Sequence, residues 1–232
     1  MQPTDALVLG VPDGDWMIEP DAESQRAHMV ESQIEARGIR DSRLLEVMRR
    51  LPRERFLPAE LARQAYDDRA LPVGLDQTIS QPYIVALMTS LLQTEPHHRV
   101  LEIGTGTGYQ TAVLASLVKR VYSIERLESL SRTARQRLAT FGLHDITYRV
   151  GDGSLGWPEE APFDRILVTA AAPRVIPTLV DQLIEGGILV LPVEAGGHQR
   201  LTTVERRPKK VIEHPSIAVR FVRLIGEEAF DA

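Results

Sequence analysis

Three glycines alternate with threonines at residues 104–108, directly after the apolar run Val100–Ile103. Glycine clears side chains from such a turn, and the helix that follows would present backbone N–H groups, so the loop suits the close approach of a nucleotide-like ligand. The spacing is G-x-G-x-G, whereas dinucleotide-binding loops have G-x-G-x-x-G. Glu102, two residues before the first glycine, would repel a pyrophosphate and attract the amino group of a methionine moiety. A tight structural turn is the alternative interpretation of the glycines alone.

Two further acidic residues follow the next two predicted strands. Glu125 ends the run at 121–124 and has the place of the acid that accepts both ribose hydroxyls in Rossmann-like sites. Asp152 lies between two glycines after the run at 146–150, where its carboxylate can accept a hydrogen bond from an adenine amino group. Each acid alone is also compatible with a surface ion pair or a plain turn. Together the three carboxylates indicate a site for S-adenosylmethionine.

Alternating strands and helices would position these residues. The predicted strands are apolar runs at 100–103, 121–124, 146–150, 165–169 and 188–193, and the predicted helices between the first three are 110–119 and 127–141. The last two strands are almost continuously apolar, as strands covered on both faces are, which favours a central parallel sheet. The runs at 201–205 and 217–224 predict antiparallel strands that close the sheet. The predicted fold class is therefore α/β.

The chain before residue 96 is predicted to be mostly helical. Apolar spacing over 27–48, broken at Gly38, indicates two short helices. The connector 51–74 contains three prolines and is expected to wrap the surface, with one short helix around 59–66. Pro82 opens an apolar helix over 82–92, because proline at the first helical position loses no hydrogen bond.

The first 25 residues differ in charge from the rest of the chain. They hold six acidic side chains and no basic one, and they have little periodic apolar pattern, so we expect a disordered or loosely docked leader. Residues 26–232 are expected to form a single domain. Within it, 26–95 would be a helical cap with the substrate segment, and 96–232 would be the cofactor-binding sheet.

The composition limits the chemistry that the chain can perform. Its 232 residues carry a formal net charge of −5 and include no cysteine. Disulfides, thiolate zinc sites and cysteine nucleophiles are therefore excluded. The net charge disfavours nucleic-acid binding. Because no apolar run approaches the roughly 20 residues of a membrane helix and no secretion signal is visible, we expect a cytoplasmic protein, and we expect neither a metal nor a membrane partner.

Two neighbouring blocks are the most specific part of the sequence. They read QTISQPYIVALM at 77–88 and VLEIGTGTGYQTAVLA at 100–115, and together they resemble the protein-L-isoaspartate O-methyltransferase family. The glycine loop suits any class I methyltransferase, whereas the TISQP block is characteristic of the isoaspartyl enzymes. The resemblance extends through HMVESQIEARGI at 28–39, RERFLP at 53–58, YSIER at 122–126, FDRILVTAAAP at 163–173 and LIEGGILVLPV at 183–193.

The resemblance implies a Rossmann-like class I methyltransferase fold, with a mainly parallel seven-stranded sheet, helices on both faces and an antiparallel C-terminal strand. It also implies methyl transfer from S-adenosyl-L-methionine to the free carboxylate of L-isoaspartyl residues in damaged proteins and peptides, which starts repair through a succinimide. The product of the cofactor would be S-adenosyl-L-homocysteine, and no metal would be needed. We expect a monomer.

The same resemblance assigns residues to the site. Ser80 matches the catalytic serine of the family. The residues implied to contact the cofactor are Thr78, Glu102, Gly104, Thr105, Gly106 and Gly108 at its methionine end, Glu125 at the ribose, and Asp152 with Gly153 at the adenine. The residues implied to line the substrate cleft are Ala170, Ala171 and Pro173. Arg223 departs from the pattern, because the family commonly has proline at this position.

Other functions remain open from the residues alone. A related enzyme would methylate ordinary aspartate in a dedicated peptide, and a non-catalytic module would keep only the cofactor pocket. An NAD-dependent oxidoreductase is disfavoured by the glycine spacing. Methyl transfer to a carboxylate needs no general base, because a carboxyl group with a pKa of about 4 is already ionised at neutral pH. Ser80, just before the helix opened by Pro82, would then orient the carboxylate; a plain helix-start role is the alternative.

Overall fold

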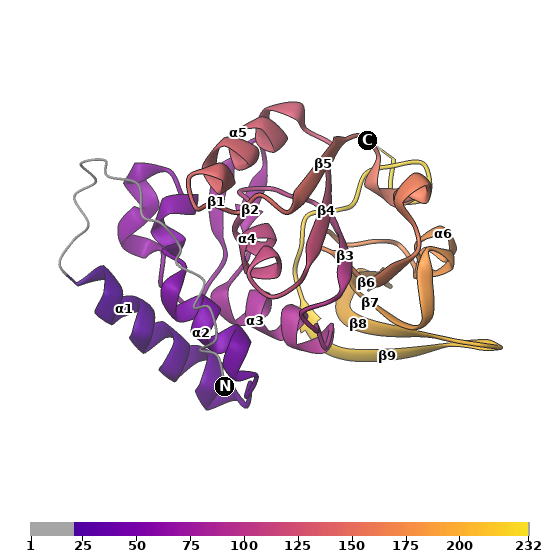
Figure 1. Cartoon of the computed structure of the whole chain (residues 1–232), viewed down its shortest axis with the longest axis horizontal. Coiled ribbons are helices and arrows are strands. Elements are labelled where there is room, and N and C mark those ends of the chain that lie inside the picture. Colours follow the sequence, from indigo (N-terminus) through magenta and orange to yellow (C-terminus); the bar gives the residue numbers. More distant parts are fainter. Residues whose placement is uncertain (1–20, 232) are drawn as a thin grey trace, which may run out of the picture.

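The computed structural model describes residues 21–231, and a seven-stranded sheet with the strand order β5-β4-β3-β6-β7-β8-β9 lies at its centre (Figure 1). The strands of this sheet are β3 (Arg99–Ile103), β4 (Arg120–Glu125), β5 (Ile146–Val150), β6 (Phe163–Val168), β7 (Leu183–Ala195), β8 (His198–Arg207) and β9 (Lys210–Val219). The strands from β5 to β7 pair in parallel, and β8 and β9 are antiparallel. The α/β class and the mainly parallel seven-stranded sheet predicted from the sequence are confirmed.

Helices cover both faces of this sheet. They are α1 (Ala22–Met29), α2 (Ser42–Arg50), α3 (Pro82–Leu91), α4 (Tyr109–Ala115), α5 (Glu128–Ala139) and α6 (Pro177–Asp181). Short π and 3₁₀ segments lie at Val30–Ile34, Glu35–Arg37, Arg53–Phe56, Ala59–Gln64, Gly153–Leu155 and Pro158–Glu160. Side chains alternate along β3, so Val100 packs with α1 to α5 in one apolar cluster and Leu101 packs with α6 in another. This two-sided burial explains why the strand sequences are so apolar.

The N-terminal helices follow the predicted order with one shift. Gly38, with φ of 93°, ends the first helical stretch, and Asp41 caps α2 by accepting from the amides of Arg43 and Leu44. The first helix already begins at Ala22, so the last residues of the predicted 1–25 leader are helical. The rest of that leader, residues 1–20, lies outside the described part of the chain.

A short hairpin in the connector is missing from the sequence prediction. β1 (Leu71–Gly74) and β2 (Gln77–Ile79) pair antiparallel and form their own two-stranded sheet. The turn residues Leu75 and Asp76 have φ of 52° and 54°, values that usually call for Asn or Gly. The Leu-Asp turn therefore gives no hairpin signal in the sequence, although β2 leads directly into Ser80.

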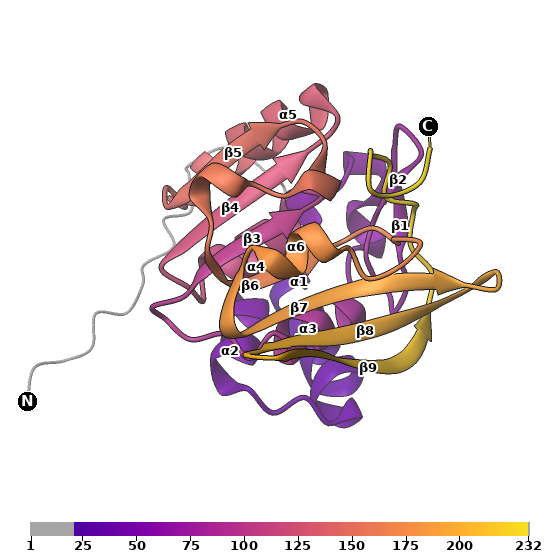
Figure 2. The ribbon, with the colours of Figure 1, turned by 90° about the vertical axis from the view of Figure 1, so that its right-hand side faces the viewer.

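The last strand lies earlier in the sequence than predicted. β9 spans Lys210–Val219 rather than 217–224, because Ile212 pairs with Glu205 across the tight basic turn. Residues 220–225 leave the sheet and run beside the segment that follows β6, where Arg223 forms an isolated parallel bridge with Ala171. Figure 2 shows the long β7–β8 hairpin reaching past the shorter parallel strands.

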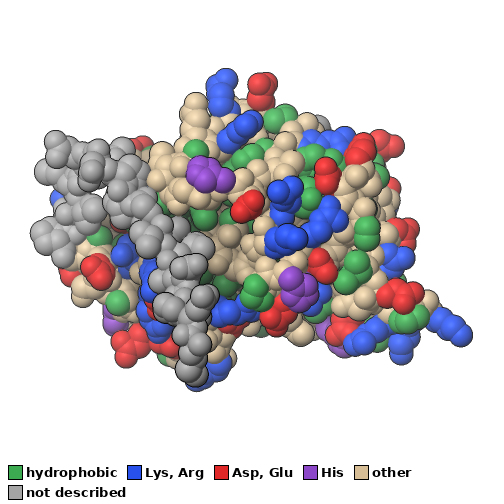
Figure 3. Space-filling view, viewed as in Figure 1, with side chains coloured by type: hydrophobic (Ala, Val, Ile, Leu, Met, Phe, Trp, Pro, Cys, Tyr) green, Lys and Arg blue, Asp and Glu red, His purple; other side chains and the backbone are tan. Residues whose placement is uncertain are grey.

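The basic run 206–210 spans the end of β8, a turn at Pro208 and Lys209, and the first residue of β9. Pro208, Lys209 and Lys210 are exposed, whereas Arg206 donates to backbone carbonyls of Asp181 and Leu183. Figure 3 shows lysine and arginine side chains on this projecting end and charges of both signs over the rest of the visible face. Among the described helices, none is long and apolar enough to cross a membrane.

Candidate cofactor and substrate pocket

A pocket opens at the carboxyl ends of β3, β4 and β6. These strands meet where the strand order reverses, since β3 pairs with β4 on one side and with β6 on the other, and such switch points are where open α/β sheets bind ligands. The space is about 960 Å³, part of it open to solvent. The sequence-predicted residues that line it are Thr78, Ser80, Gly104, Thr105, Gly106, Glu125, Gly153 and Ala170.

The glycine loop between β3 and α4 needs its glycines for conformation and for space. Gly104, Gly106 and Gly108 have φ of 95°, 53° and 89°, which disfavours any other residue type. A Cβ on Gly104 would also come 2.2 Å from Thr169 Oγ1, and one on Gly108 would come 3.2 Å from the Leu138 side chain. Gly108 lies outside the pocket lining and lets α4 pack closely against α5, and its predicted contact with the cofactor stays a prediction.

Glu125 faces the pocket from the end of β4 and is only 8% exposed. Its Oε2 accepts from the Gly106 amide at 2.9 Å, and its Oε1 accepts from the Leu127 amide at 3.0 Å. Each carboxylate oxygen can accept two hydrogen bonds, so both retain acceptor capacity toward a diol. The arrangement fits a ribose and orients the carboxylate by two elements at once.

Glu102 lies behind the loop rather than in the pocket lining. It is fully buried, and its Oε2 accepts from the hydroxyls of Thr111 and Ser123, both at 2.6 Å. Oε1 is buried with no hydrogen-bond partner. Burial raises the pKa of Glu102 to about 8, against the opposing effect of those two hydroxyls. The predicted contact of Glu102 with the cofactor therefore stays a prediction, and its visible role is to tie β3 to β4 and α4.

Asp152 is also engaged by the protein itself. Its Oδ1 accepts from the amide and hydroxyl of Ser154 at 2.8 and 2.7 Å, and its Oδ2 accepts from the Glu227 amide at 2.7 Å. Although partial burial opposes the shift, these hydrogen bonds lower the pKa of Asp152. Gly153 lines the pocket and Asp152 does not. Asp152 thus holds the C-terminal segment beside the place predicted for the adenine.

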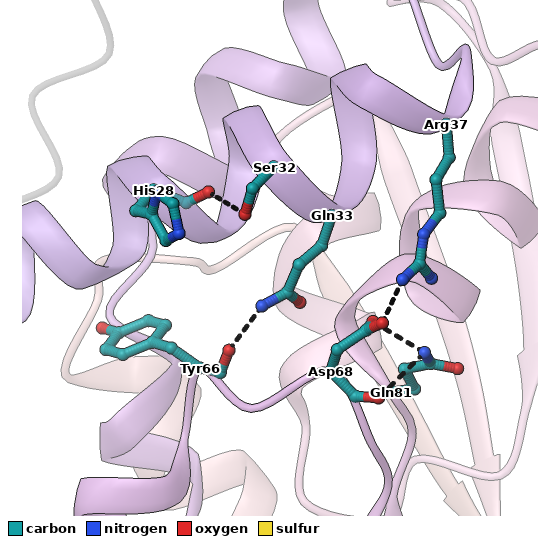
Figure 4. A network of polar contacts seen from close by, with 7 residues as sticks. All are labelled: His28, Ser32, Gln33, Arg37, Tyr66, Asp68 and Gln81. Carbon is teal, nitrogen blue, oxygen red and sulfur yellow. Dashed lines mark hydrogen bonds and ion pairs between the residues drawn. The ribbon is translucent and has the colours of Figure 1, made fainter.

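The side of the pocket that the sequence predicts for the substrate is formed by the end of β2 and the start of α3. Thr78 and Ser80 both line the pocket, and Pro82 occupies the first turn of α3, as predicted. Gln81 fixes this junction from outside, because its Nε2 donates to the Asp68 carbonyl at 3.1 Å and to Asp68 Oδ1 at 2.7 Å (Figure 4). Arg37 forms an ion pair with the same Asp68 carboxylate.

Of the residues after β6 that are predicted to contact the substrate, one lines the pocket and the others lie outside its lining. Ala170 lines the pocket. Ala171 is fully buried, and its amide donates to the Val222 carbonyl while its carbonyl accepts from the Leu224 amide, both at 2.8 Å. Pro173 is outside the lining. Ala171 therefore holds the returning C-terminal segment in place.

That returning segment, Phe221–Ile225, forms a wall of the pocket that sequence reasoning missed. The apolar residues of this segment predict a strand of the sheet. In the structure they lie after the end of β9 and line the pocket instead. Arg223 contributes to this wall while Nη2 donates to Glu194 Oε1 at 2.7 Å and its guanidinium lies 4.6 Å from the centre of the Phe230 ring. This chain thus has an exposed ion pair at the pocket edge.

No metal site accompanies the pocket within residues 21–231, where no group of three or more His, Cys, Asp or Glu could hold an ion. His98 belongs to the turn before β3, and its Nδ1 accepts from the Glu95 amide at 2.9 Å. Burial, chiefly, lowers the pKa of His98.

Comparison with known proteins agrees with this geometry. Residues 24–229 match the sequence profile of the family described as protein-L-isoaspartate(D-aspartate) O-methyltransferase. A protein-L-isoaspartate O-methyltransferase 1 of Syntrophobacter fumaroxidans is 53% identical over 87% of this chain and 94% of its own length. The corresponding enzyme of Trichlorobacter lovleyi is 52% identical over 88% of this chain and 95% of its own length.

Solved structures give the same result. One described as a protein-L-isoaspartate O-methyltransferase has a TM-score of 0.78 and 27% identity, and the match covers 89% of this chain and 67% of that one. A putative enzyme of this kind from Plasmodium falciparum, in complex with S-adenosyl-L-homocysteine, shares the fold with a TM-score of 0.75 and 24% identity, over 86% of this chain and 98% of that one. With the profile matching nearly every described residue, the chain belongs to the protein-L-isoaspartate(D-aspartate) O-methyltransferase family.

Proposed function

We propose that Ser80 and the start of α3 orient the substrate carboxylate, while the glycine loop and Glu125 hold the cofactor on the opposite side of the pocket. As a member of its family, the chain is an S-adenosylmethionine-dependent enzyme that methylates the free carboxylate of L-isoaspartyl residues in damaged proteins and peptides, and so starts repair through a succinimide. The observation that supports the residue roles best is that Ser80, Gly106 and Glu125 line one pocket.

The residues of the pocket fit the cofactor. Glu125 has spare acceptor capacity for ribose hydroxyls. At Gly153, a Cβ would come 2.3 Å from Ile103 Cγ2, so the pocket wall at this position has room for glycine only. We assign Gly104, Thr105 and Gly106 to the methionine end and Gly153 to the adenine end. Glu102 and Asp152 act beside them as supports of the loop and of the C-terminal segment. When bound, S-adenosylmethionine supplies an activated methyl group on a sulfonium.

The substrate carboxylate is already ionised when it binds, so the protein does not need to remove a proton from it. The task left to the chain's own residues is to align this carboxylate with the methyl group and to remove water from it. Alignment of two reactants can lower a barrier by about 7–11 kcal/mol. The Ser80 hydroxyl can donate to one carboxylate oxygen, and the other oxygen then stays free to attack. Ala170 and the wall at 221–225 exclude water from the apolar side of the same pocket.

We also infer that the enzyme acts in the cytoplasm, as a monomer, on isoaspartyl proteins and peptides. The net charge of −5 and the mixed charges on the visible face (Figure 3) offer no strongly basic field to nucleic acid or to anionic membranes.

Replacement of Ser80 by Ala tests the central assignment. We expect single-turnover methyl transfer to an isoaspartyl peptide to fall by about 10-fold or more, which corresponds to about 1.4 kcal/mol of transition-state stabilisation, with little change in cofactor affinity. Glu125→Ala is the matched comparison, and it should mainly weaken cofactor binding in calorimetry. An unchanged transfer rate in Ser80→Ala would remove the orienting role of the serine.

A further inference from the structure

A fully buried arginine contacts the backbone of Ser80, which lines the pocket. Arg53 begins the 3₁₀ segment Arg53–Phe56, and its exposure is 0%. By volume it is the first among the fully buried side chains of residues 21–231. Arginine is almost never fully buried unless it is paired, so its contacts indicate why the fold retains it.

The guanidinium of Arg53 joins three separate parts of the chain. Nε donates to the Ala65 carbonyl at 2.7 Å, and Nη2 donates to the Ser80 carbonyl at 2.7 Å. Its central carbon lies 4.8 Å from the centre of the Tyr109 ring. Ala65 precedes the turn that carries Asp68, and Tyr109 is the first residue of α4. One side chain therefore connects the Ser80 junction with the Asp68 turn and with the helix after the glycine loop.

No carboxylate compensates this charge within the described part of the chain. Arg53 forms no ion pair there, and Nη1 is buried without a hydrogen-bond partner. The neighbouring Glu54 instead accepts from the Tyr66 hydroxyl and lies 3.9 Å from Arg26. Burial lowers the pKa of Arg53 to about 10, so the side chain stays cationic at neutral pH. Burying an unpaired cation costs stability, and a shape-matched apolar residue would avoid this cost.

We propose that Arg53 is a positioning residue for methyl transfer, which fixes the Ser80 carbonyl from inside the fold so that the Ser80 hydroxyl faces the pocket in one orientation. The proposal rests on the role assigned to Ser80 above. The same junction is held from the outside by the Gln81–Asp68 contact (Figure 4). Ser80 is thus held by the buried Arg53, and its neighbour Gln81 is held by an exposed contact with Asp68.

The planar fork of arginine explains why this residue type is needed. A guanidinium donates in fixed directions from several nitrogens at once, whereas the ammonium of lysine is a single point on a flexible stem. Only the fork reaches the carbonyls of Ala65 and Ser80 together. Arg53→Lys therefore keeps the charge and removes part of the positional restraint.

The test is a double-mutant cycle between Arg53→Lys and Ser80→Ala, read as kcat/KM for an isoaspartyl peptide. Because Arg53 acts through Ser80, we expect Arg53→Lys to lower kcat/KM by about 10-fold in the wild-type background and by less than about 3-fold in the Ser80→Ala background. The affinity for S-adenosyl-L-homocysteine, measured by calorimetry, should change little. Equal losses in the two backgrounds, or no loss in either, would overturn the inference.

Two further measurements separate positioning from stability and from the proposed function. Met48→Ala removes packing from a fully buried site in α2, and it should lower Tm without lowering kcat/KM below the transition. Hydrogen exchange of amides at 78–81 should accelerate in Arg53→Lys, while exchange in β3 stays unchanged. The inference fails if exchange at 78–81 does not change, whatever the activity. A wild-type chain that transfers no methyl to the peptide contradicts the proposed function, and the exchange experiment still decides on the placement of Ser80 by Arg53.

Discussion

The three acidic side chains near the carboxyl ends of β3, β4 and β5 have different surroundings and different roles. Glu125 faces the pocket and keeps acceptor capacity, Glu102 is buried among hydroxyls, and Asp152 binds the amide of Glu227. The sequence could identify their places at the strand ends, because that needs only local pattern. The sequence could not predict which groups surround each carboxylate. For example, the Glu227 amide that binds Asp152 is 75 residues away along the chain.

Glu102 predicts a pH dependence of stability. Because burial raises its pKa to about 8 from the usual value of 4.5, the folded chain holds a proton that the unfolded chain releases between these two values. The stability from this proton is complete below the lower value and is lost as the pH rises toward about 8. Urea unfolding from pH 5 to 8 should show a decline for the wild type, of at most about 1.4 kcal/mol per pH unit.

Glu102→Gln is the matched variant for this measurement. It keeps the shape of the side chain and has no proton to lose in this range, so its unfolding free energy should rise relative to the wild type as the pH increases. Parallel stability curves for the two proteins between pH 5 and 8 would show that Glu102 is ionised in the folded chain.

Helices and loops that depend on local residue preferences agree with the sequence prediction, whereas strands that depend on pairing with distant residues do not always agree. Pro82 at the start of α3 and the glycine loop after β3 are confirmed, because local residue preferences decide both. The β1–β2 hairpin was missed because its turn has Leu75 and Asp76 in a left-handed conformation. The end of β9 differs from the sequence prediction because the apolar residues at 220–225 line the pocket and pair with Ala171, after β6, instead of continuing the strand.

Gly226 offers a test of how the C-terminal segment supports the pocket. A Cβ there would come 2.0 Å from Asp152 Oδ1 and 2.5 Å from Ser154 Oγ. Gly226→Ala should therefore displace the amides of Glu227 and Glu228 from Asp152 and Ser154. We expect a loss of about 1–3 kcal/mol in unfolding free energy and weaker binding of S-adenosyl-L-homocysteine, since Leu224 and Ile225 line the pocket.

Gly151→Ala is the control for this change. A Cβ at Gly151 meets no atom within 4 Å, and the backbone there is not left-handed, so stability and cofactor binding should stay near those of the wild type. If both variants bind the cofactor product equally well, the C-terminal segment does not shape the cofactor site.

At the scale of the whole molecule, the pocket results from the order of the strands. β3 lies between β4 and β6, so the loops that follow these strands diverge and leave a crevice. The junction between β2 and α3 adds Ser80 to one side of this crevice, and residues 221–225 return to cover another. The sheet and the cofactor loop could be predicted from local sequence, whereas the closure of the pocket depends on contacts between distant segments.

Methyl transfer to isoaspartate is tested most directly with labelled S-adenosylmethionine and two peptides that differ only in an isoaspartyl or an aspartyl linkage. We expect base-labile methyl ester on the isoaspartyl peptide alone. Equal labelling of both peptides would instead indicate a general carboxyl methyltransferase, and labelling of neither would contradict catalysis of this reaction by the pocket.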